Sequence, residues 1–314
     1  MAELQRITDY PALLEEAWGR AIAPRDPGAP TVISTFAGCG GSSLGYHMAG
    51  FQELLAVEWE QNAVDTFRLN FPHVPVYHGD IAKLSVEECL HLAGVKPGEL
   101  TVFDGSPPCQ GFSTAGKREL DDDRNKLFRE YCRLLRGLQP RAFVMENVSG
   151  MVKGDFKLVF AEVLRALKAC GYRVKARLLN AMYFGVPQSR ERMIFVGVRE
   201  DIEREPSHPR GWSEPIPLIA IAPDAVAARS QQINPWIPAS RSVCTITKTP
   251  FKRMIRTASN ERPPTAIELS QFGSFPSDFK WTGRPDAMWQ RIGNSVPPLF
   301  MRAIAEHVRG ILDV

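Results

Sequence analysis

The chain has 314 residues, enough for one large domain and a smaller one around a sizeable hydrophobic core. With 44% hydrophobic and 23% charged residues, its composition is that of an ordinary soluble globular protein. A formal net charge of only +3 excludes a strongly basic chain, so any contact with nucleic acid must come from a local patch.

Residues 1–30 are predicted to form a helix and a linker. Pro11 suits the first turn of a helix, and apolar residues recur on one face at Leu13, Leu14, Ala17, Trp18 and Ala21. The stretch 24–30, rich in proline, then ends the helix. We expect this segment to pack against the rest of the chain rather than to carry function.

A buried strand is predicted at 31–36, followed by a glycine-rich turn (residues 37–45, AGCGGSSLG) and a helix. Strand, glycine turn and helix in this order are typical of a nucleotide-type cofactor site. The turn lacks a Gly-Lys-Ser/Thr sequence, which excludes a phosphate-binding P-loop.

Acidic residues follow the next two predicted strands. Glu58 ends the strand 54–57, twenty residues beyond Gly38, where an acid would accept the ribose hydroxyls. Trp59 can stack on an adenine ring, and Asp80, after the strand 76–78, can accept from the adenine amino group. Taken singly, each acid could instead cap a helix or be solvated. Together, at successive strand ends, they predict a cofactor site.

The predicted strand 100–103 leads into Asp104, Gly105 and two prolines, and Cys109 comes next. The prolines hold the backbone extended, so Cys109 is presented at the carboxyl end of a strand, where ligands bind in open α/β sheets. A lone cysteine is usually a small buried hydrophobe, but these neighbours favour a nucleophile. The polar stretch 114–124 is expected to be a surface loop, followed by a helix with an apolar face from Leu127 to Leu138.

The next predicted strand, 141–145, ends in Glu146, which would point into the same crevice as Cys109 or would cap a helix. Two further strands are predicted at 173–179 and 193–198. Between them lies Gln188-Ser189-Arg190-Glu191-Arg192. From spacing alone, its arginines are most simply a solvated pair at the start of a strand.

Residues 200–281 differ from the rest, because they are rich in proline and lack alternating strands and helices. A basic cluster suited to phosphates is formed by Lys248, Lys252, Arg253 and Arg256. A turn at 293–298 then precedes a helix whose apolar face runs from Phe300 to Ile311.

The six cysteines show neither a CxxC pair nor metal-ligand spacing with histidine: Cys39, Cys89, Cys109, Cys132, Cys170 and Cys244. They are expected to be reduced thiols of a cytosolic protein, and no metal site is predicted. The sequence shows no signal peptide, no apolar run long enough to span a membrane and no internal repeat.

The sequence Pro108-Cys109-Gln110-Gly111-Phe112-Ser113 resembles the nucleophile motif of the DNA cytosine-5 methyltransferases. Other motifs of that family follow in the family's order, from about Thr31 to about Val308. The resemblance implies an α/β fold: a doubly wound, mostly parallel, Rossmann-like sheet of the S-adenosylmethionine-dependent methyltransferase type, with a terminal antiparallel hairpin at 173–198. It also implies a catalytic domain formed by 1–199 and completed by 283–314, and a small irregular target-recognition domain at 200–282.

The implied reaction moves a methyl group from S-adenosylmethionine to C5 of a flipped-out cytosine in double-stranded DNA, within a preferred sequence context. Cys109 would bond covalently to C6 of the base, and Glu146 would hold its N3 and amino edge. Arg192 would reach the base O2 or orient the nucleophile, and Arg190 would brace the carboxylate or a phosphate. The implied role is that of a prokaryotic modification enzyme, either in a restriction–modification pair or as an orphan.

The resemblance also assigns contact residues. The cofactor S-adenosylmethionine would contact Phe36, Ala37, Gly38, Gly40, Gly41, Leu44, Glu58, Trp59, Asp80, Ile81, Asp104, Pro107, Asn294 and Ser295. The DNA would contact Pro108, Gln110, Ser113, Lys117, Arg118 and Gln188. The segment 114–118 would act as a mobile lid that closes on DNA.

A cytoplasmic, nucleoid-associated monomer without membrane contact is expected, and a cognate restriction endonuclease or a specificity partner stays open. Only about seventy residues separate Arg192 from Arg262, which is short for a recognition domain of this family. Specificity is therefore expected to be low, to depend on a partner, or to be read from compact loops. The sequence Arg262-Pro263-Pro264-Thr265 resembles the start of the helix that anchors that domain, so its role is expected to be structural.

Three rival hypotheses stay open. RNA could be the substrate, although the form of residues 110–113 resembles the bacterial DNA enzymes more than the tRNA-modifying branch. The chain could be a catalytically silent DNA-binding homologue, although such a protein has no need of Cys109 and Glu146. A nicotinamide dehydrogenase is disfavoured, because its glycine turn would carry a third glycine where this chain has Ser43.

Overall fold

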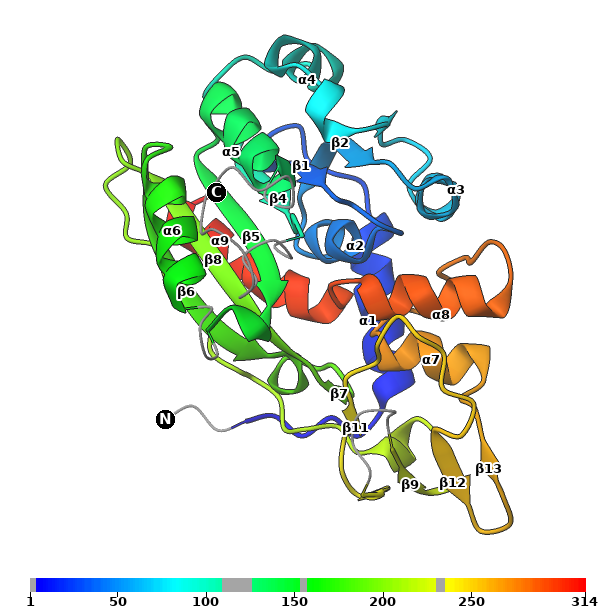
Figure 1. Cartoon of the computed structure of the whole chain (residues 1–314). Helices are drawn as coiled ribbons and strands as arrows, with labels where there is room; N and C mark the ends of the chain where they lie inside the picture. The colour runs from blue at the N-terminus through cyan, green and yellow to red at the C-terminus, as the bar shows by residue number, and fades with distance from the viewer. Residues whose placement is uncertain (1–3, 109–125, 153–156, 230–234) are drawn as a thin grey trace.

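The protein is built around a seven-stranded sheet, shown by a computed structural model that describes residues 4–108, 126–152, 157–229 and 235–314 (Figure 1). The strand order is β3-β2-β1-β4-β5-β8-β6. The strands are β1 (Thr31–Thr35), β2 (Gln52–Glu58), β3 (Val76–His78), β4 (Val102–Gly105), β5 (Ala142–Val148), β6 (Tyr172–Asn180) and β8 (Glu191–Arg199).

The pairing of these strands confirms the predicted fold class. β3, β2, β1, β4 and β5 run parallel to one another. β8 pairs antiparallel with both β5 and β6, so the predicted terminal hairpin forms one edge of the sheet. The carboxyl ends of β1, β2, β4 and β5 therefore meet at one edge of the sheet, where ligands bind in folds of this kind.

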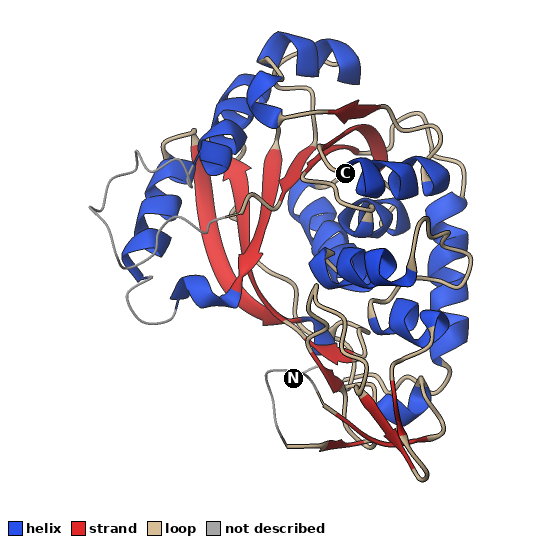
Figure 2. Ribbon diagram, turned by 45° about the vertical axis from the view of Figure 1, so that its right-hand side comes forward, coloured by secondary structure: helices blue, strands red, loops and turns tan. Residues whose placement is uncertain are grey.

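Helices cover both faces of the sheet (Figure 2). One layer contains α1 (Tyr10–Ile22), α2 (Gly41–Met48) and α9 (Pro298–Leu312), and the other contains α4 (Val86–Ala93), α5 (Lys126–Leu138) and α6 (Lys157–Lys168). α3 (Gln61–Asn70) follows β2 and contacts β3. Alternate strand residues enter the two cores: Val32, Val102 and Val144 on one side, Ile33, Phe103 and Phe143 on the other.

The C-terminal helix lies directly against the first glycine-turn helix. A Cβ atom added to Gly45 in α2 would lie 2.6 Å from the Met301 Cβ atom and 2.7 Å from the Pro298 carbonyl oxygen of α9. Only glycine permits this close approach of two helices. The last element of the chain is thereby placed beside the glycine turn of the first βα unit, and α8 (Pro285–Asn294) immediately precedes it.

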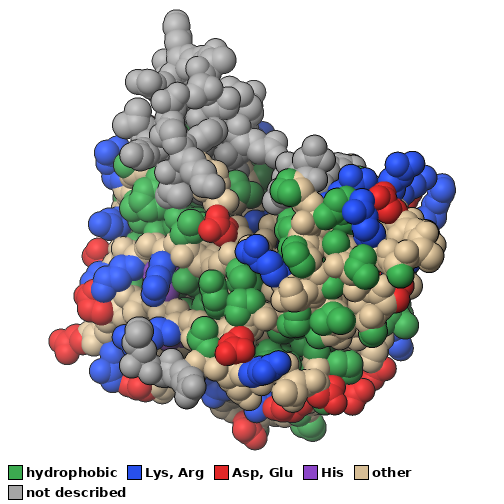
Figure 3. All heavy atoms as spheres, turned by 90° about the horizontal axis from the view of Figure 1, so that it is seen from below, with side chains coloured by type: hydrophobic (Ala, Val, Ile, Leu, Met, Phe, Trp, Pro, Cys, Tyr) green, Lys and Arg blue, Asp and Glu red, His purple; other side chains and the backbone are tan. Residues whose placement is uncertain are grey.

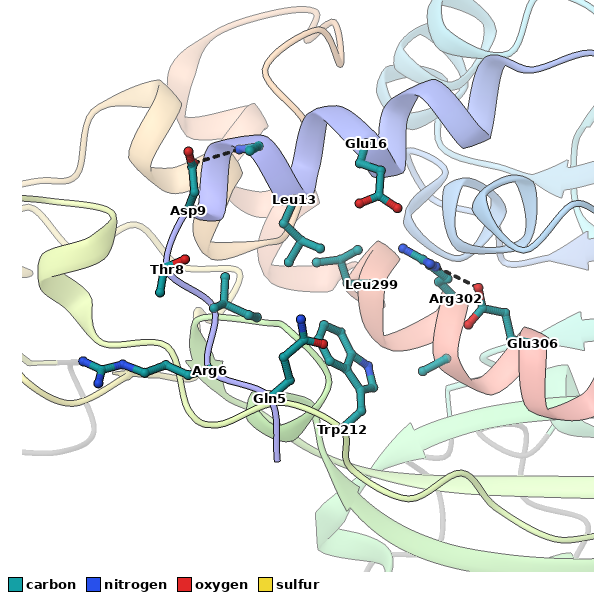
Figure 4. Close-up of a pocket in the computed structure, with 13 residues that line it drawn as sticks. Gln5, Arg6, Thr8, Asp9, Leu13, Glu16, Trp212, Leu299, Arg302 and Glu306 are labelled. Atoms are coloured by element: carbon teal, nitrogen blue, oxygen red, sulfur yellow. Dashed lines mark hydrogen bonds and ion pairs between the residues drawn. The ribbon is translucent and has the colours of Figure 1, made fainter. Parts of the chain in front are cut away.

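The N-terminal segment packs as expected. The Gln5 amide donates to the Trp212 carbonyl oxygen at 2.7 Å, and Asp9 caps α1 by accepting from the Ala12 amide at 3.0 Å. Between this segment and α9 lies a hollow of about 470 Å³ (Figure 4). Its wall includes Arg302, which donates to Glu306 at 2.9 Å. The segment thus holds α1 in place against the body of the protein.

Residues 200–282 contain more regular structure than predicted (Figure 1, lower right). A four-stranded sheet has the order β10-β9-β12-β13, with β9 (Ala225–Ala228), β10 (Ile237–Pro238), β12 (Ile255–Thr257) and β13 (Glu261–Arg262). A two-stranded pair joins β11 (Val243–Cys244) to β7 (Gln188–Ser189). These strands have two to four residues each, too few for apolar alternation to reveal them in the sequence.

α7 (Ala266–Phe272) begins with a capping box between Thr265 and Glu268. Arg262 donates to Glu268 at 2.7 Å and to Asp224 at 2.5 Å, and these hydrogen bonds raise the pKa of Arg262. Arg262 therefore ties the small sheet to α7, in keeping with the structural role expected for this motif. None of the described helices has the length and apolarity needed to cross a bilayer.

Candidate active site

A pocket of about 610 Å³ opens at the carboxyl edge of the main sheet; we name it the strand-end pocket. Its lining comes from the ends of β1, β2, β4 and β5, from the glycine turn and from the junction of α8 with α9. The residues are Phe36, Ala37, Gly38, Cys39, Gly41, Ser42, Val57, Glu58, Trp59, Glu60, Ala63, Gly79, Asp80, Ile81, Asp104, Gly105, Ser106, Pro108, Leu127, Glu146, Val148, Arg291, Asn294, Ser295, Val296 and Met301.

The glycine turn is open toward the pocket. Phe36, Gly38 and Gly40 all have positive φ angles, of 55°, 56° and 94°. A Cβ atom added at Gly38 would meet no heavy atom within 4 Å, whereas one at Gly41 would lie 2.4 Å from the Val296 carbonyl oxygen. The turn therefore exposes backbone to a ligand at Gly38 and lets the C-terminal segment approach at Gly41.

Glu58 holds the turn in place as well as lining the pocket. Its Oε2 atom accepts from the Gly38 amide at 2.7 Å, and its Oε1 atom accepts from the amides of Trp59 and Glu60, each at 2.9 Å. The Trp59 side chain beside it is 76% exposed. Asp80 caps a short turn by accepting from the Ala82 amide at 3.0 Å, so its capping role and its place in the pocket coexist.

Asp104 lies on the floor of the pocket at the end of β4. Its carboxylate accepts from the Ser42 hydroxyl at 2.6 Å and from the Tyr46 hydroxyl at 3.2 Å, both in α2. The residue is only 4% exposed, and burial raises the pKa of its carboxyl group to about 7. This carboxyl group is thus partly protonated near neutral pH.

Glu146 forms an ion pair with Arg192, 2.6 Å from the guanidinium Nε atom to Oε1. Both side chains are nearly buried, 11% exposed for Glu146 and 13% for Arg192. The pairing of β5 with β8 sets Arg192 opposite Val148, two residues beyond Glu146 on the same strand. Arg192 therefore fixes the direction of the one carboxylate that β5 supplies to the pocket.

Asn147 is a site residue to which the sequence assigned no role. Its Nδ2 atom donates to the Pro107 carbonyl oxygen at 3.0 Å, and its Oδ1 atom accepts from the Val148 amide at 2.9 Å. This side chain, 4% exposed, ties the end of β5 to the diproline segment before Cys109. The signal in the sequence was an amide at a strand end, directly beside a candidate catalytic acid.

Arg190 and Gln188 have other partners in the structure than those that the resemblance implies. Arg190, 2% exposed, donates to the carbonyl oxygens of Ile246, Gly293 and Ser295 at 3.0, 2.9 and 2.9 Å, and burial lowers its pKa to about 9. It does not hydrogen-bond the Glu146 carboxylate, which Arg192 holds instead.

Gln188 is 1% exposed and donates to the Phe272 carbonyl oxygen at 2.6 Å. Strand structure is interrupted at residue 190, between β7 and β8. The alternation that would have carried Gln188, Arg190 and Arg192 onto one face is therefore interrupted.

The other residues predicted to contact the cofactor, the base or DNA fall into three groups: those in the pocket lining, those outside it and those outside the described residues. Those that line the strand-end pocket are Phe36, Ala37, Gly38, Gly41, Glu58, Trp59, Asp80, Ile81, Asp104, Asn294, Ser295, Pro108 and Glu146. Leu44 is instead fully buried in the core, and Gly40 packs against Phe71. Pro107 contacts Asn147 and is outside the pocket lining. Cys109, Gln110, Ser113, Lys117 and Arg118 fall outside the described residues.

The basic cluster of the small domain is only partly free. Lys248, Lys252, Arg253 and Arg256 are all exposed, but Arg256 also stacks over the Trp236 ring at 3.9 Å and pairs with Glu261 at 3.1 Å. The face seen from below mixes basic with acidic side chains rather than forming one continuous positive surface (Figure 3). A phosphate contact is therefore better suited to Lys248, Lys252 and Arg253 than to Arg256, whose charge Glu261 already meets.

Comparison with known proteins identifies the family. Residues 30–221 and 220–310 match the family described as C-5 cytosine-specific DNA methylase. The chain belongs to this family. It is a DNA (cytosine-5-)-methyltransferase, as the sequence predicted.

This methylase is similar to type II enzymes along most of its length. It is 34% identical over 322 residues to the type II methyltransferase M1.HphI of Haemophilus parahaemolyticus, covering 88% of this chain and 86% of that one. It is 44% identical over 177 residues to M.AquIA of Picosynechococcus sp., covering 54% and 71%.

Among solved structures, a protein described as a DNA modification methyltransferase encoded within an E. coli prophage has a TM-score of 0.75 at 21% identity, covering 91% of this chain and 100% of that one. The S. pombe Dnmt2 methyltransferase has a TM-score of 0.67 at 19% identity, with the same coverage. These two likenesses show the methyltransferase fold.

Enzymes of this family use S-adenosylmethionine, and the charges of the strand-end pocket fit it. Five lining residues are acidic, namely Glu58, Glu60, Asp80, Asp104 and Glu146, and Arg291 is the one basic residue among the described lining. Such a lining suits a ligand that carries positive charge. It opposes a pyrophosphate, which a nicotinamide cofactor would bring.

Proposed function

We propose that this methylase binds S-adenosylmethionine in the strand-end pocket and methylates C5 of a cytosine that is flipped out of duplex DNA. One observation carries the proposal. The cofactor pocket, the ion-paired Glu146 and the Pro108 that immediately precedes Cys109 all share one cavity. Donor, acid and nucleophile motif thus converge on a single space at the carboxyl edge of the sheet.

Different residues of the pocket lining are suited to different parts of S-adenosylmethionine. Glu58 already receives three amide hydrogens, and a carboxylate has about four acceptor sites, so one site on Oε2 is left for a ribose hydroxyl. Trp59 is exposed for stacking on adenine, and Asp80 lies beside it for the adenine amino group. The open backbone at Gly38 and the segment at Asn294 and Ser295 would enclose the methionine end.

The chemistry requires a nucleophile and a group that polarises the base. Cytosine C6 is a poor electrophile, and the Cys109 thiolate adds to it only when the ring can accept the electron pair at N3. Glu146, aimed by Arg192, would share a proton with N3 and accept from the exocyclic amine. Bound donor supplies an electrophilic methyl group to C5. Loss of the C5 proton then restores the C5–C6 double bond and expels the thiolate.

Base flipping follows from the depth of these groups. Glu146 is 9% exposed and lies in a cavity, so it cannot reach a base that is stacked inside a duplex. We propose one short sequence context for the reaction and a role in DNA modification, on the likeness to type II methyltransferases. The small sheet and the exposed basic side chains of 248–253 are our candidates for reading that context.

The test is conversion-based sequencing of DNA from a methylation-free bacterial host that expresses the wild-type protein or Cys109→Ser. We expect 5-methylcytosine in one short context with the wild type and none with the variant, since serine is a far weaker nucleophile. Methylation that persists in Cys109→Ser would overturn the covalent mechanism. A soluble wild-type protein that binds the donor yet leaves host DNA unmethylated would overturn DNA as the substrate.

A further inference from the structure

The buried acids of the strand-end pocket differ in the protein groups that compensate their negative charge. Glu58 receives three backbone amide hydrogens, and Glu146 has the guanidinium of Arg192. From the described residues, Asp104 receives only two side-chain hydroxyl hydrogens, those of Ser42 and Tyr46. No lysine, arginine or histidine among the described residues forms an ion pair with Asp104.

The described elements packed against Asp104 offer it hydroxyl groups and no ion pair. α2 presents the hydroxyls of Ser42 and Tyr46, and β1 presents the Thr35 hydroxyl, which donates to the Asp104 backbone oxygen at 3.0 Å. The neighbouring acids, Glu53 from β2 and Glu146 from β5, raise the pKa of Asp104 further.

On the opposite side, α5 contributes the buried Tyr131, whose pKa is raised by burial and further by Asp104. The groups of these elements that act on Asp104 are acids or phenols, whereas His47 of α2 pairs with Glu53 at 3.3 Å and Arg291 lines the same pocket. A buried carboxylate in such surroundings costs free energy unless a cation reaches it.

A bound cation could reach Asp104 from the strand-end pocket. Asp104, Ser42, Gly105 and Ser106 all line it, and the open glycine turn lies above the same floor. We propose that Asp104 is the residue that recognises the positive charge of the donor's amino-acid end. This inference rests on the proposed binding of S-adenosylmethionine in the strand-end pocket. Two cationic groups share this chemistry: the sulfonium, which only the donor carries, and the α-ammonium, which the thioether product keeps.

The proposal predicts that the affinity for S-adenosylmethionine depends on pH and falls at acid pH. In the free protein the Asp104 carboxyl group titrates near pH 7, and a bound cation favours its ionised form. Below pH 7 a proton must leave before the cation binds, so affinity falls by up to about tenfold per pH unit. Above pH 7 the carboxylate is already ionised, and affinity becomes independent of this group.

The test is calorimetric titration of the full-length protein with three ligands at about pH 6 and about pH 8, on either side of the Asp104 titration. S-adenosylmethionine carries both cations, S-adenosylhomocysteine carries only the ammonium, and 5′-methylthioadenosine carries neither. The variant is Asp104→Asn, because the hydroxyls of Ser42 and Tyr46 can donate to or accept from an amide.

Glu53→Gln is the matched control. Glu53 is also a buried acid bonded to α2, through Ser43 at 2.8 Å, but it does not line the pocket. Thermal melts confirm that each variant is folded. The wild-type pH dependence is a second measurement that needs no variant.

We expect Asp104→Asn to weaken S-adenosylmethionine binding at least tenfold at about pH 8, to leave 5′-methylthioadenosine unchanged and to abolish the pH dependence. Glu53→Gln should bind all three ligands as the wild type does at about pH 8, and the loss of its charge should move the pH dependence to lower pH. If S-adenosylhomocysteine weakens equally, the recognised group is the ammonium; if it does not, the group is the sulfonium. Equal affinities for wild type and Asp104→Asn, or a wild-type affinity that does not change with pH, would overturn the inference and leave the proposed function intact. A folded wild type that binds none of the three ligands would overturn both.

Discussion

Arg190 and Arg192 stand two residues apart in the chain and have different tasks. Arg192 meets a carboxylate, so its charge is neutralised where the reaction is proposed to occur. Arg190 meets three backbone carbonyl oxygens and no carboxylate, which is why burial lowers its pKa. The first contact sets the direction of a reactive group, and the second joins segments of the fold.

Replacing Arg192 by alanine should leave Glu146 without its ion pair. We expect methyl transfer to duplex DNA to fall about 100-fold or more in single-turnover assays, because the acid loses its direction toward the base. Binding of S-adenosylmethionine should change little. Arg177→Ala, an exposed position on the neighbouring strand β6, is the control. Near-wild-type transfer by Arg192→Ala would show that Glu146 is positioned without it.

The Asp104 carboxyl group should also make the free protein less stable at neutral pH. Its folded-state pKa of about 7 lies above the ordinary value of 3.8, so its favourable contribution is present below pH 3.8 and lost as pH rises to 7. Asp104→Asn should therefore stabilise the ligand-free protein near pH 8, by at most about 4 kcal/mol. Urea denaturation at several pH values measures this, and no gain near pH 8 would contradict the buried, uncompensated charge.

At the scale of the element, the end of β5 contributes one residue to the strand-end pocket and one to the diproline segment. Successive strand residues point to opposite sides, so Glu146 faces the pocket while Asn147 reaches Pro107. The acid and the segment that precedes the proposed nucleophile are therefore both held by one strand. The sequence revealed the acid because strand-end carboxylates are conspicuous. The role of Asn147 could not be predicted from the sequence, because its partner is a backbone carbonyl oxygen forty residues earlier.

Asn147→Asp keeps the oxygen that accepts from Val148 but removes the donor to Pro107. We expect a fall of about 10- to 100-fold in the rate of methyl transfer, because the diproline segment before Cys109 loses this tie. Donor affinity should be preserved, which calorimetry can check. Asn147→Ala, which removes both contacts, should be at least as impaired. A fully active Asn147→Asp would remove this residue from the site.

For the whole molecule, the sequence predicted the main sheet well because its strands are apolar runs bounded by glycine, proline or an acid. It also predicted most of the pocket, since Glu58, Asp80 and Glu146 each follow such a run. It missed the small sheet, whose shortest strands have two residues, and the task of Arg190. The Arg190 partners lie at 246, 293 and 295, and no local pattern in the sequence reports contacts over such separations.

Arg190 joins β7 and β8 to the small domain and to the junction of α8 with α9. Arg190→Met should leave three buried carbonyl oxygens unpaired and lower the free energy of unfolding by about 3–5 kcal/mol. Donor affinity should fall too, because Ser295 lines the strand-end pocket. Denaturation and calorimetry measure the two effects, and the exposed Arg284→Met is the control. Unchanged stability would contradict a joining role.

The strand-end pocket takes its walls from both ends of the chain, from Phe36 near the start to Met301 near the finish. On the ribosome, the first five strands emerge well before α9, and the glycine turn must wait for the helix that packs on Gly45. A polypeptide that stops before α9 would lack the wall that Met301 adds to the proposed donor pocket, so we expect it not to bind the donor.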